Sequence, residues 1–311
     1  MNIIDLHVHS LVSDGSYTPH DLAFHAKEVG LSAFALTDHD NIAGNEEAAA
    51  AAKEQGLDFI NGMELTADFM GRKLHIVCLG FDAEHPAFQK LYERIRSVKE
   101  GKIPEIIDYV CAKGIDISLE KVQPFAFGKL DRYAIMRYLV SLHLYDRAQP
   151  LWDNYLDPAV RELGLDQNMP AEEALPAIHA AGGVTSLAHF HKNIGLKGLS
   201  RAEQEEAIAR LHALGLDGME RWYPNYTAED SAFAAKMIEK YGLLVTGGTD
   251  FHGSNRPQIE MGHGIAGNMA IPYEVYTKVI LNKSHSYLQK ISRGAAGECR
   301  GDRELKSRRS I

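Results

Sequence analysis

Short apolar segments that end in histidine or carboxylate residues recur along the chain, and this pattern constrains the fold most strongly. The segments NIIDLHV, SAFALT, LDFINGMEL, GVTSLAHF and LLVTGGTDFHG read as β-strands separated by helical stretches. Such alternation is typical of β-α units that feed a mostly parallel sheet. Since α/β folds place their sites at the carboxyl ends of strands, we expect these polar side chains to meet at one edge. The sequence predicts an α/β fold.

The helices between these strands can be placed from their capping signals. Thr18 is expected to be an N-cap, with Pro19 at the first helical position and Asp21 at capping-box spacing, and Gly30 is expected to end the helix. The alanine-rich NEEAAAAAKEQ and the segments at about 200–214 and 227–241 predict three more helices.

The central and final parts of the chain differ from this pattern. Residues 86–166 read mainly as helices, and we interpret them as a helical insertion or lid that covers a site. Residues 294–311 contain almost no large apolar side chains, which predicts a flexible tail.

Composition favours a soluble, cytoplasmic protein. Of the residues, 45% are hydrophobic and 24% charged, and no apolar run approaches the roughly 20 residues that a membrane span needs. The N-terminus does not resemble a secretory signal. Three well-separated cysteines, Cys78, Cys111 and Cys299, argue against a disulfide framework. The net charge of −9 disfavours a membrane surface or a long nucleic acid as partner, so we expect a phosphate to be attracted locally by bound cations.

Histidine and carboxylate pairs supply the chemistry. His7 and His9 are two apart on one strand, so both side chains emerge on the same face and can bind one cation. A lone pair of this kind is usually a surface or core pair, and a lone His75 in an apolar strand is usually a core residue. The two-apart spacing recurs at His189 and His191 and again at Asp250 and His252. Because Zn²⁺ and Mn²⁺ accept imidazole and carboxylate together, the whole set predicts a metal site.

These motifs resemble, in order, those of the polymerase and histidinol phosphatase (PHP) domain family, in its small stand-alone phosphoesterase branch. The resemblance covers roughly residues 1–270 and is carried by HVHSLVSDGSYTP, ALTDHD, NGMEL, LHIVCLGF, AAGGVTSLAH and GTDFHG. It implies a distorted β/α barrel of the PHP type with about seven strands. The catalytic barrel would comprise residues 1–85 and 167–290, with 86–166 as the insertion.

The resemblance also implies two or three divalent cations, Mn²⁺, Zn²⁺ or Fe²⁺, in three ligand sets. The first set is His7, His9, Glu64 and Asp250; the second is Glu64, His75 and His189; the third is Asp14, His39 and His252. Glu64 would bridge the first two cations. Asp38 and Asp40 are interpreted either as supporting the ligands, because a metal-bound imidazole generally donates its other N–H to a carboxylate or carbonyl, or as structural residues.

Two stretches depart from the family pattern. The usual His-Pro-Gly-Arg is His189-Phe190-His191-Lys192 here, and the Arg-Pro-His of the insertion is Arg132-Tyr133-Ala134. The substrate can therefore differ from that of better-known relatives.

The predicted reaction is hydrolysis of a phosphate ester by a metal-activated hydroxide. His191, Asp250 and His252 are the predicted catalytic residues, with His191 as a candidate proton donor to the leaving oxygen. Candidate phosphate contacts are Arg132, Arg137, Lys192 and Arg221. Trp222 and Tyr223 fit either stacking on a base or sugar or packing in the core.

A small nucleotide or sugar phosphate is the preferred substrate. The alternative is a cyclic phosphodiesterase or 5'-3' exoribonuclease. A less favoured reading is a metal-dependent amidohydrolase acting on C–N bonds, which would release ammonia or an amine instead of phosphate. A non-catalytic PHP module is disfavoured because every expected ligand position is filled. The oligomeric state is left open.

Overall fold

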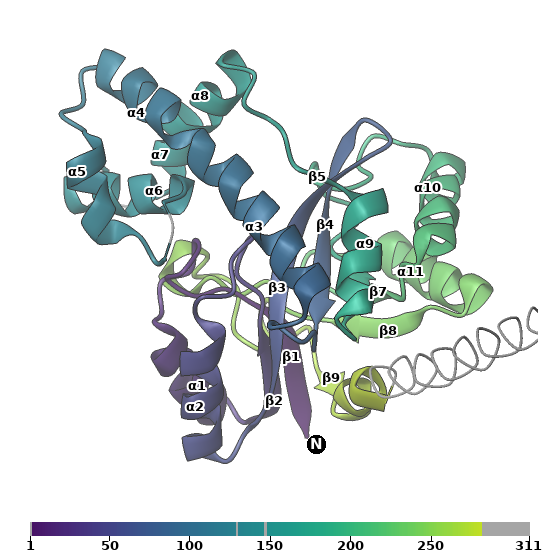
Figure 1. The fold of residues 1–311 in the computed structure, drawn as a ribbon. Helices are drawn as coiled ribbons and strands as arrows, with labels where there is room; N and C mark the ends of the chain where they lie inside the picture. The colour runs from purple at the N-terminus through teal and green to yellow at the C-terminus, as the bar shows by residue number, and fades with distance from the viewer. Residues whose placement is uncertain (1, 129, 146–147, 282–311) are drawn as a thin grey trace, which may run out of the picture.

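The computed structural model describes residues 2–128, 130–145 and 148–281, and its centre is one curved sheet (Figure 1). The sheet order is β8-β7-β6-β4-β3-β2-β1-β9, with β5 paired to β3. The strands are β1 (Ile3–Val8), β2 (Leu31–Leu36), β3 (Asp58–Phe69), β4 (Arg72–Leu79), β5 (Met169–Pro170), β6 (Val184–Leu187), β7 (Gly218–Trp222), β8 (Leu244–Gly247) and β9 (Ile271–Pro272). The predicted tail at 294–311, like residues 282–290, lies outside the described residues.

The two ends of the sheet meet through the segment that follows β8. The amide of Asp250 donates to the carbonyl of His7 at 2.9 Å, and the amide of His9 donates to the carbonyl of Phe251 at 2.9 Å. A Cβ atom on Gly248 would lie 2.4 Å from the His7 backbone nitrogen, so only glycine permits this approach. The sheet is therefore a nearly closed barrel, which confirms the predicted distorted β/α barrel.

Most strand pairs of the sheet are parallel, as expected, but some are not. β4 runs antiparallel to its two neighbours, β3 and β6, and the short β9 runs antiparallel to β1. A tight hairpin joins β3 to β4 at Met70 and Gly71, whose φ angles are 49° and 70°. Such a hairpin needs no crossover helix, so the β-α alternation is interrupted here.

Helices that pack around the barrel include α1 (Pro19–Glu28), α2 (Asn45–Gln55), α9 (Ala171–Ala180), α10 (Arg201–Leu214) and α11 (Ala228–Tyr241) (Figure 1). The predicted capping of α1 is confirmed, since the Thr18 hydroxyl accepts from the Asp21 amide at 3.0 Å. The helix ends at Glu28, and Gly30 follows in a left-handed conformation with φ of 80°.

Residues between β4 and β5 form a separate group of helices at one side of the barrel (Figure 1). These are α3 (Pro86–Gly101), α4 (Ile103–Ala112), α5 (Leu119–Val122), α6 (Arg132–Ser141), α7 (Gln149–Leu151) and α8 (Asp157–Glu162), with short irregular turns at Gln123–Phe125 and Trp152–Leu156. Helices α4 to α8 share an apolar core that includes Ile106, Val110, Leu139 and Leu156. Helix α3 instead packs Phe88, Leu91 and Ile95 into the core of the barrel. The described residues within 86–166 are therefore mainly helical. Within the described ranges, none of the helices is long and apolar enough to cross a membrane.

Candidate metal centre

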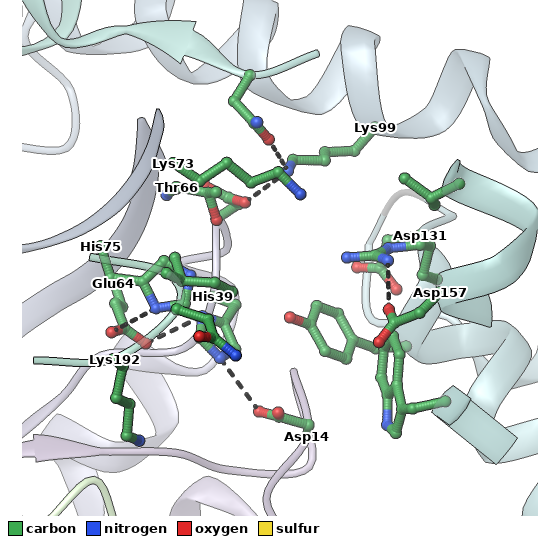
Figure 2. Close-up of a pocket in the computed structure, with 18 of the residues that line it drawn as sticks. Asp14, His39, Glu64, Thr66, Lys73, His75, Lys99, Asp131, Asp157 and Lys192 are labelled. Carbon is green, nitrogen blue, oxygen red and sulfur yellow. Dashed lines mark hydrogen bonds and ion pairs between the residues drawn. The ribbon is translucent and has the colours of Figure 1, made fainter. Parts of the chain in front are cut away.

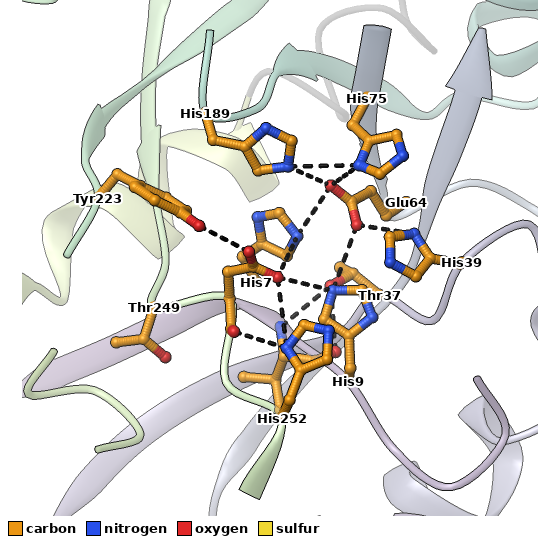
Figure 3. Close-up of polar contacts among 12 residues, drawn as sticks. His7, His9, Thr37, His39, Glu64, His75, His189, Tyr223, Thr249 and His252 are labelled. Carbon is orange, nitrogen blue, oxygen red and sulfur yellow. Dashed lines mark hydrogen bonds and ion pairs between the residues drawn. The ribbon is translucent and has the colours of Figure 1, made fainter. Parts of the chain in front are cut away.

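Glu64 on β3 is the centre of a buried cluster of imidazoles and carboxylates (Figure 3). Its two carboxylate oxygens lie 3.2 Å from His7 Nε2 and 3.3 Å from His9 Nε2. His9 Nε2 is also 3.2 Å from Asp250 Oδ1. These four residues can present ligand atoms to one cation, and they match the first ligand set implied by the family resemblance.

A second group lies on the other side of Glu64. His75 Nδ1 and His189 Nε2 approach its Oε1 at 2.9 and 2.8 Å. His39 Nδ1 lies 3.0 Å from its Oε2, so His39, Glu64 and His75 form a compact group. The implied second set contained His189 in place of His39. The structure places both imidazoles within reach of the carboxylate.

The third group surrounds Asp14 at the mouth of the barrel. Asp14 Oδ1 is 3.2 Å from His252 Nε2 and 3.7 Å from His39 Nε2. His9 joins this group, with Nδ1 at 3.7 Å from the same oxygen. The implied set of Asp14, His39 and His252 is therefore brought together, and His9 lies between the first and third groups.

Several buried polar atoms of the cluster lack a hydrogen-bond partner among the described residues. They are His7 Nε2, His9 Nε2, Asp14 Oδ1, Glu64 Oε2, His189 Nδ1 and His252 Nε2. A buried polar atom left unpaired costs about 1–3 kcal/mol, so a cluster of them at one point is unfavourable without a further partner. Imidazole nitrogens and carboxylate oxygens are the donor set of borderline divalent cations. The residues present therefore fit such cations.

The charges in the cluster also favour cation binding. Burial lowers the pKa of His189 to about 3 and that of His252 to about 4, which keeps both imidazoles in the neutral form that binds metals. Burial also opposes charge on His9, but contacts with Asp250 and Glu64 raise its pKa to about 9. A proton and a cation therefore compete for His9.

Strained backbone conformations occur at three positions around the cluster. Asp40, His189 and Asp250 have φ angles of 50°, 22° and 54°, in the region that favours glycine. Such conformations cost about 1–3 kcal/mol each and persist where surrounding contacts enforce them. Here each one directs the chain sharply away at the end of a barrel strand.

Glu220 on β7 supports two of the imidazole residues and was not predicted from the sequence. Its Oε1 lies 2.7 Å from His7 Nδ1, and its Oε2 accepts from the His189 amide at 2.6 Å. Carboxylates in this position orient a ligating imidazole. The contacts of Asp38 and Asp40 agree with the structural one of their two predicted roles. Asp38 accepts from Ser10 and Ser13, and Asp40 accepts from the Thr66 amide and pairs with Lys99.

The cluster opens into a cavity of about 610 Å³ that lies between the barrel and the helical insertion (Figure 2). Asp14, His39, Glu64 and His75 line one side, and Asp131 and Asp157 of the insertion face them (Figure 2). Among the predicted catalytic and substrate residues, those that line the cavity are His191, Asp250, His252, Arg132 and Lys192.

Two predicted phosphate contacts lie elsewhere. Arg137 does not line the cavity; its Nη1 donates to the carbonyls of Leu11 and Ser13 at 2.7 and 3.0 Å, where it holds the loop that carries Asp14. Arg221 is also absent from the cavity lining and lies over the Trp222 ring.

The predicted stacking pair is likewise placed outside the cavity lining. Trp222 packs against the core inside the sheet. Tyr223 is 3% exposed, and its hydroxyl donates to Asp250 Oδ2 at 2.6 Å (Figure 3). The structure therefore shows Trp222 and Tyr223 in packing roles, the second of the two roles predicted for them.

Comparison with known families identifies residues 5–165 as a PHP domain. The chain belongs to the PHP domain family. A 5'-3' exoribonuclease of Haemophilus influenzae is 32% identical, over 80% of this chain and 89% of the relative. A 3',5'-nucleoside bisphosphate phosphatase of Chromobacterium violaceum is 30% identical, over 84% and 90%. A proposed metal-dependent phosphoesterase of Bifidobacterium adolescentis shares the fold, with a TM-score of 0.77 and 24% identity over 90% of this chain and 96% of that one.

These matches confirm the predicted family and the reaction class, metal-dependent hydrolysis of phosphoester bonds. The two curated relatives match over 80% and 84% of this chain.

Proposed function

We propose that this PHP protein hydrolyses a phosphoester of a small nucleotide or sugar phosphate. The observation that carries the proposal is the position of the unpaired ligand atoms, at the base of a cavity of limited volume beneath the insertion. A cavity of about 610 Å³ is of the size that takes small organic molecules. A sugar phosphate or a mononucleotide is of this size, and a folded nucleic acid is not.

Two or three divalent cations, Mn²⁺, Zn²⁺ or Fe²⁺, are proposed to bind the three residue groups around Glu64 and Asp14. When bound, they supply the charge that polarises a phosphoryl oxygen and makes water acidic enough to attack near neutral pH. Glu64 holds adjacent groups together because its two oxygens face different imidazoles. Glu220 keeps the His7 ring oriented toward Glu64.

Substrate contacts are proposed for the charged and aromatic side chains of the cavity wall. Lys192 and Arg132 line the wall and offer cationic donors to a phosphate. Tyr133 and Trp152 line it as well, with ring centroids 5.3 Å apart, and give an apolar surface for a base or sugar. His191 also lines the cavity, and we retain it as the proposed proton donor to the leaving oxygen.

A cyclic phosphodiesterase or 5'-3' exoribonuclease activity is the second candidate. It is favoured by the 32% identity to the Haemophilus influenzae exoribonuclease. The net charge of −9 weighs against long nucleic acids, but the end of a short oligonucleotide would fit the same cavity.

The reducing environment suggested by unpaired Cys78 and Cys111 supports a cytoplasmic location.

A substrate panel tests the two candidates. Protein loaded with Mn²⁺ or Zn²⁺ is incubated with nucleotide bisphosphates, sugar phosphates, cyclic phosphodiesters and short RNAs, and released phosphate and cleaved products are measured. Phosphate from a small monoester supports the proposal. Cleavage of diesters alone supports the second candidate, and release of an amine from a C–N substrate with no phosphoester cleaved would contradict both.

Substrate affinity is expected to fall above pH 8 because of Lys102. This side chain lines the cavity, and its Nζ donates to the Gln167 carbonyl at 2.6 Å. Burial, together with the neighbouring charges of Lys99 and Arg132, lowers its pKa to about 8, although Asp166 and Asp40 oppose the shift. The positive charge is present below this pKa and is lost as pH rises through it. Since the second ionisation of a phosphomonoester is near pH 6, the charge of such a substrate stays constant over the pH range in which Lys102 loses its charge.

Measurement of KM between pH 7 and 9 checks this prediction. We expect KM of the wild type to rise about fivefold relative to Lys102→Arg, whose guanidinium stays charged throughout. Lys53→Arg, at an exposed position on α2, is the control and should follow the wild type. An equal rise of KM in Lys102→Arg and wild type would exclude Lys102 as the cause.

A further inference from the structure

Asp250 uses its two carboxylate oxygens for different partners. Oδ2 receives hydrogen bonds from Arg256 Nη1 at 2.6 Å, from the Tyr223 hydroxyl at 2.6 Å and from Lys192 Nζ at 2.9 Å. Oδ1 faces the imidazole cluster, 3.2 Å from His9 Nε2. The three donors therefore fix the rotation of the carboxylate, so that one oxygen remains directed at the metal centre.

The segment that carries Arg256 is itself held firmly against the site. The Ser254 amide donates to the Ser16 hydroxyl at 2.8 Å, and Asn255 Nδ2 donates to the Asp14 carbonyl at 2.7 Å. Gly253 has a φ of 62°, and a Cβ atom there would lie 2.1 Å from Ser16 Oγ. Arg256 is thus anchored through contacts to the loop that contains Asp14.

The guanidinium of Arg256 has more donors than its contact with Asp250 uses. It carries five N–H donors in a planar fork, and only Nη1 has a hydrogen-bond partner within the described residues. The side chain lines the cavity beside His252 and His189. Unused donors of this kind are available to a ligand at the metal centre.

The charges around Oδ2 point to an anionic ligand. Arg256 and Lys192 both direct a positively charged group at one carboxylate oxygen of the cluster. Tyr223 donates from a hydroxyl, whose pKa is raised well above its usual value by burial and by Asp250, and it adds no charge. A phosphoryl group bound at the metal centre would meet these two cationic side chains.

We propose that Arg256 has two roles: it positions Asp250 as a metal ligand through Nη1, and it binds the phosphoryl group of the substrate through its remaining nitrogens. Lys192 is the second cation of this Asp250 clamp. Arginine suits both roles because its planar fork offers separate nitrogens to a carboxylate and a phosphate in a fixed geometry, whereas an ammonium acts as a point charge. The inference rests on the phosphoester chemistry proposed above.

The test uses full-length protein with Arg256→Met, Arg256→Lys and, as control, Arg210→Met. Arg210 is 58% exposed on α10 and pairs only with Glu206 among the described residues. Binding of inorganic phosphate to metal-loaded protein is measured by calorimetry. Metal affinity is measured by titration with Co²⁺, whose absorption spectrum reports on its ligand geometry. Circular dichroism verifies that each variant is folded.

We expect Arg256→Met to weaken phosphate binding by about 10- to 100-fold, the value of a lost charge-assisted hydrogen bond. It should also weaken Co²⁺ binding by about tenfold and alter the spectrum, because Asp250 loses one of the three donors that restrain its carboxylate. Arg256→Lys should keep Co²⁺ affinity close to wild type and still lose at least about tenfold in phosphate affinity. Arg210→Met should match the wild type in both measurements.

Different outcomes contradict different parts of the inference. Unchanged phosphate affinity in fully loaded Arg256→Met overturns the phosphate contact, and unchanged Co²⁺ affinity and spectrum overturn the positioning role. Neither measurement requires turnover. If the wild type cleaves none of the phosphoesters while both effects are found, the proposed function fails and the assignment of Arg256 stands.

Discussion

Replacement of Glu64 is expected to abolish metal-dependent turnover. Both Glu64→Ala and Glu64→Gln should lower kcat/KM by about 10³-fold or more, because residues that merely support ligands already contribute 10- to 100-fold. The reason is geometric: Glu64 lies 2.8 to 3.3 Å from five imidazoles, so its loss removes the shared negative charge of two ligand groups. Metal content measured by mass spectrometry after gel filtration should fall by at least one cation per chain.

Glu220→Gln is the matched control for this experiment. It makes the same change from carboxylate to amide in a buried strand residue. Among the described residues, however, the Glu220 carboxylate is hydrogen-bonded to the outer nitrogen of His7 and the amide of His189, and not to Glu64 or Asp250. We expect a loss of about 10- to 100-fold and largely retained metal. Near-normal metal content and turnover in Glu64→Gln would remove Glu64 from the centre of the site.

The contribution of β1 to the site follows from local sequence rules. Side chains alternate between the faces of a strand, so His7 and His9 had to emerge together, as the structure shows. The same rule places Asp5 on this face of the strand. An acidic residue in the apolar run NIIDLHV was therefore a signal that could have identified Asp5 as a buried polar residue of this face. The capping of α1 was predictable for the same reason: it depends on neighbouring residues only.

Other parts of the site depend on pairings that local patterns do not encode. Glu64 lies in the middle of β3, since this strand continues to Phe69 and turns back as β4. The antiparallel register pairs Thr66 with His75, and this pairing brings His75 to the cluster from the opposite direction. The rule that ligands follow the carboxyl ends of strands could not place either residue.

Charged residues outside the motifs were the hardest to interpret. Arg137 and Arg221 were predicted to contact phosphate from residue type alone, but type does not specify whether a guanidinium faces a cavity or backbone carbonyls. Arg256 and Glu220, in contrast, were not predicted as site residues, although the structure shows both in contact with residues of the cluster. Glu220 meets His7 across 213 residues, through the closure of the barrel. Arg256 meets Asp250 only six residues away, through the conformation of the loop after β8, which residue spacing alone does not specify.

The stability of this closure is expected to depend on Asp5. The side chain is fully buried. Its Oδ1 accepts from the amides of Thr249 and His7 at 2.9 and 3.2 Å, and its Oδ2 accepts from the Thr249 hydroxyl and the Gly262 amide at 2.5 and 2.8 Å. Asp5→Ala would leave these buried donors without an acceptor. We expect the free energy of unfolding to fall by about 3–5 kcal/mol.

Urea unfolding in the presence of a chelator measures this effect without the contribution of metal binding. Asp58→Ala is the control: it makes the same change at an exposed position whose contact is the Tyr273 hydroxyl, and it should cost less than about 0.5 kcal/mol. A loss below about 1 kcal/mol in Asp5→Ala would show that the closure does not depend on this carboxylate. Thr249, which Asp5 holds, directly precedes Asp250 (Figure 3). The Asp5→Ala variant, once refolded with metal, should therefore also bind Co²⁺ more weakly. This result would link closure of the barrel to the assembly of the metal centre.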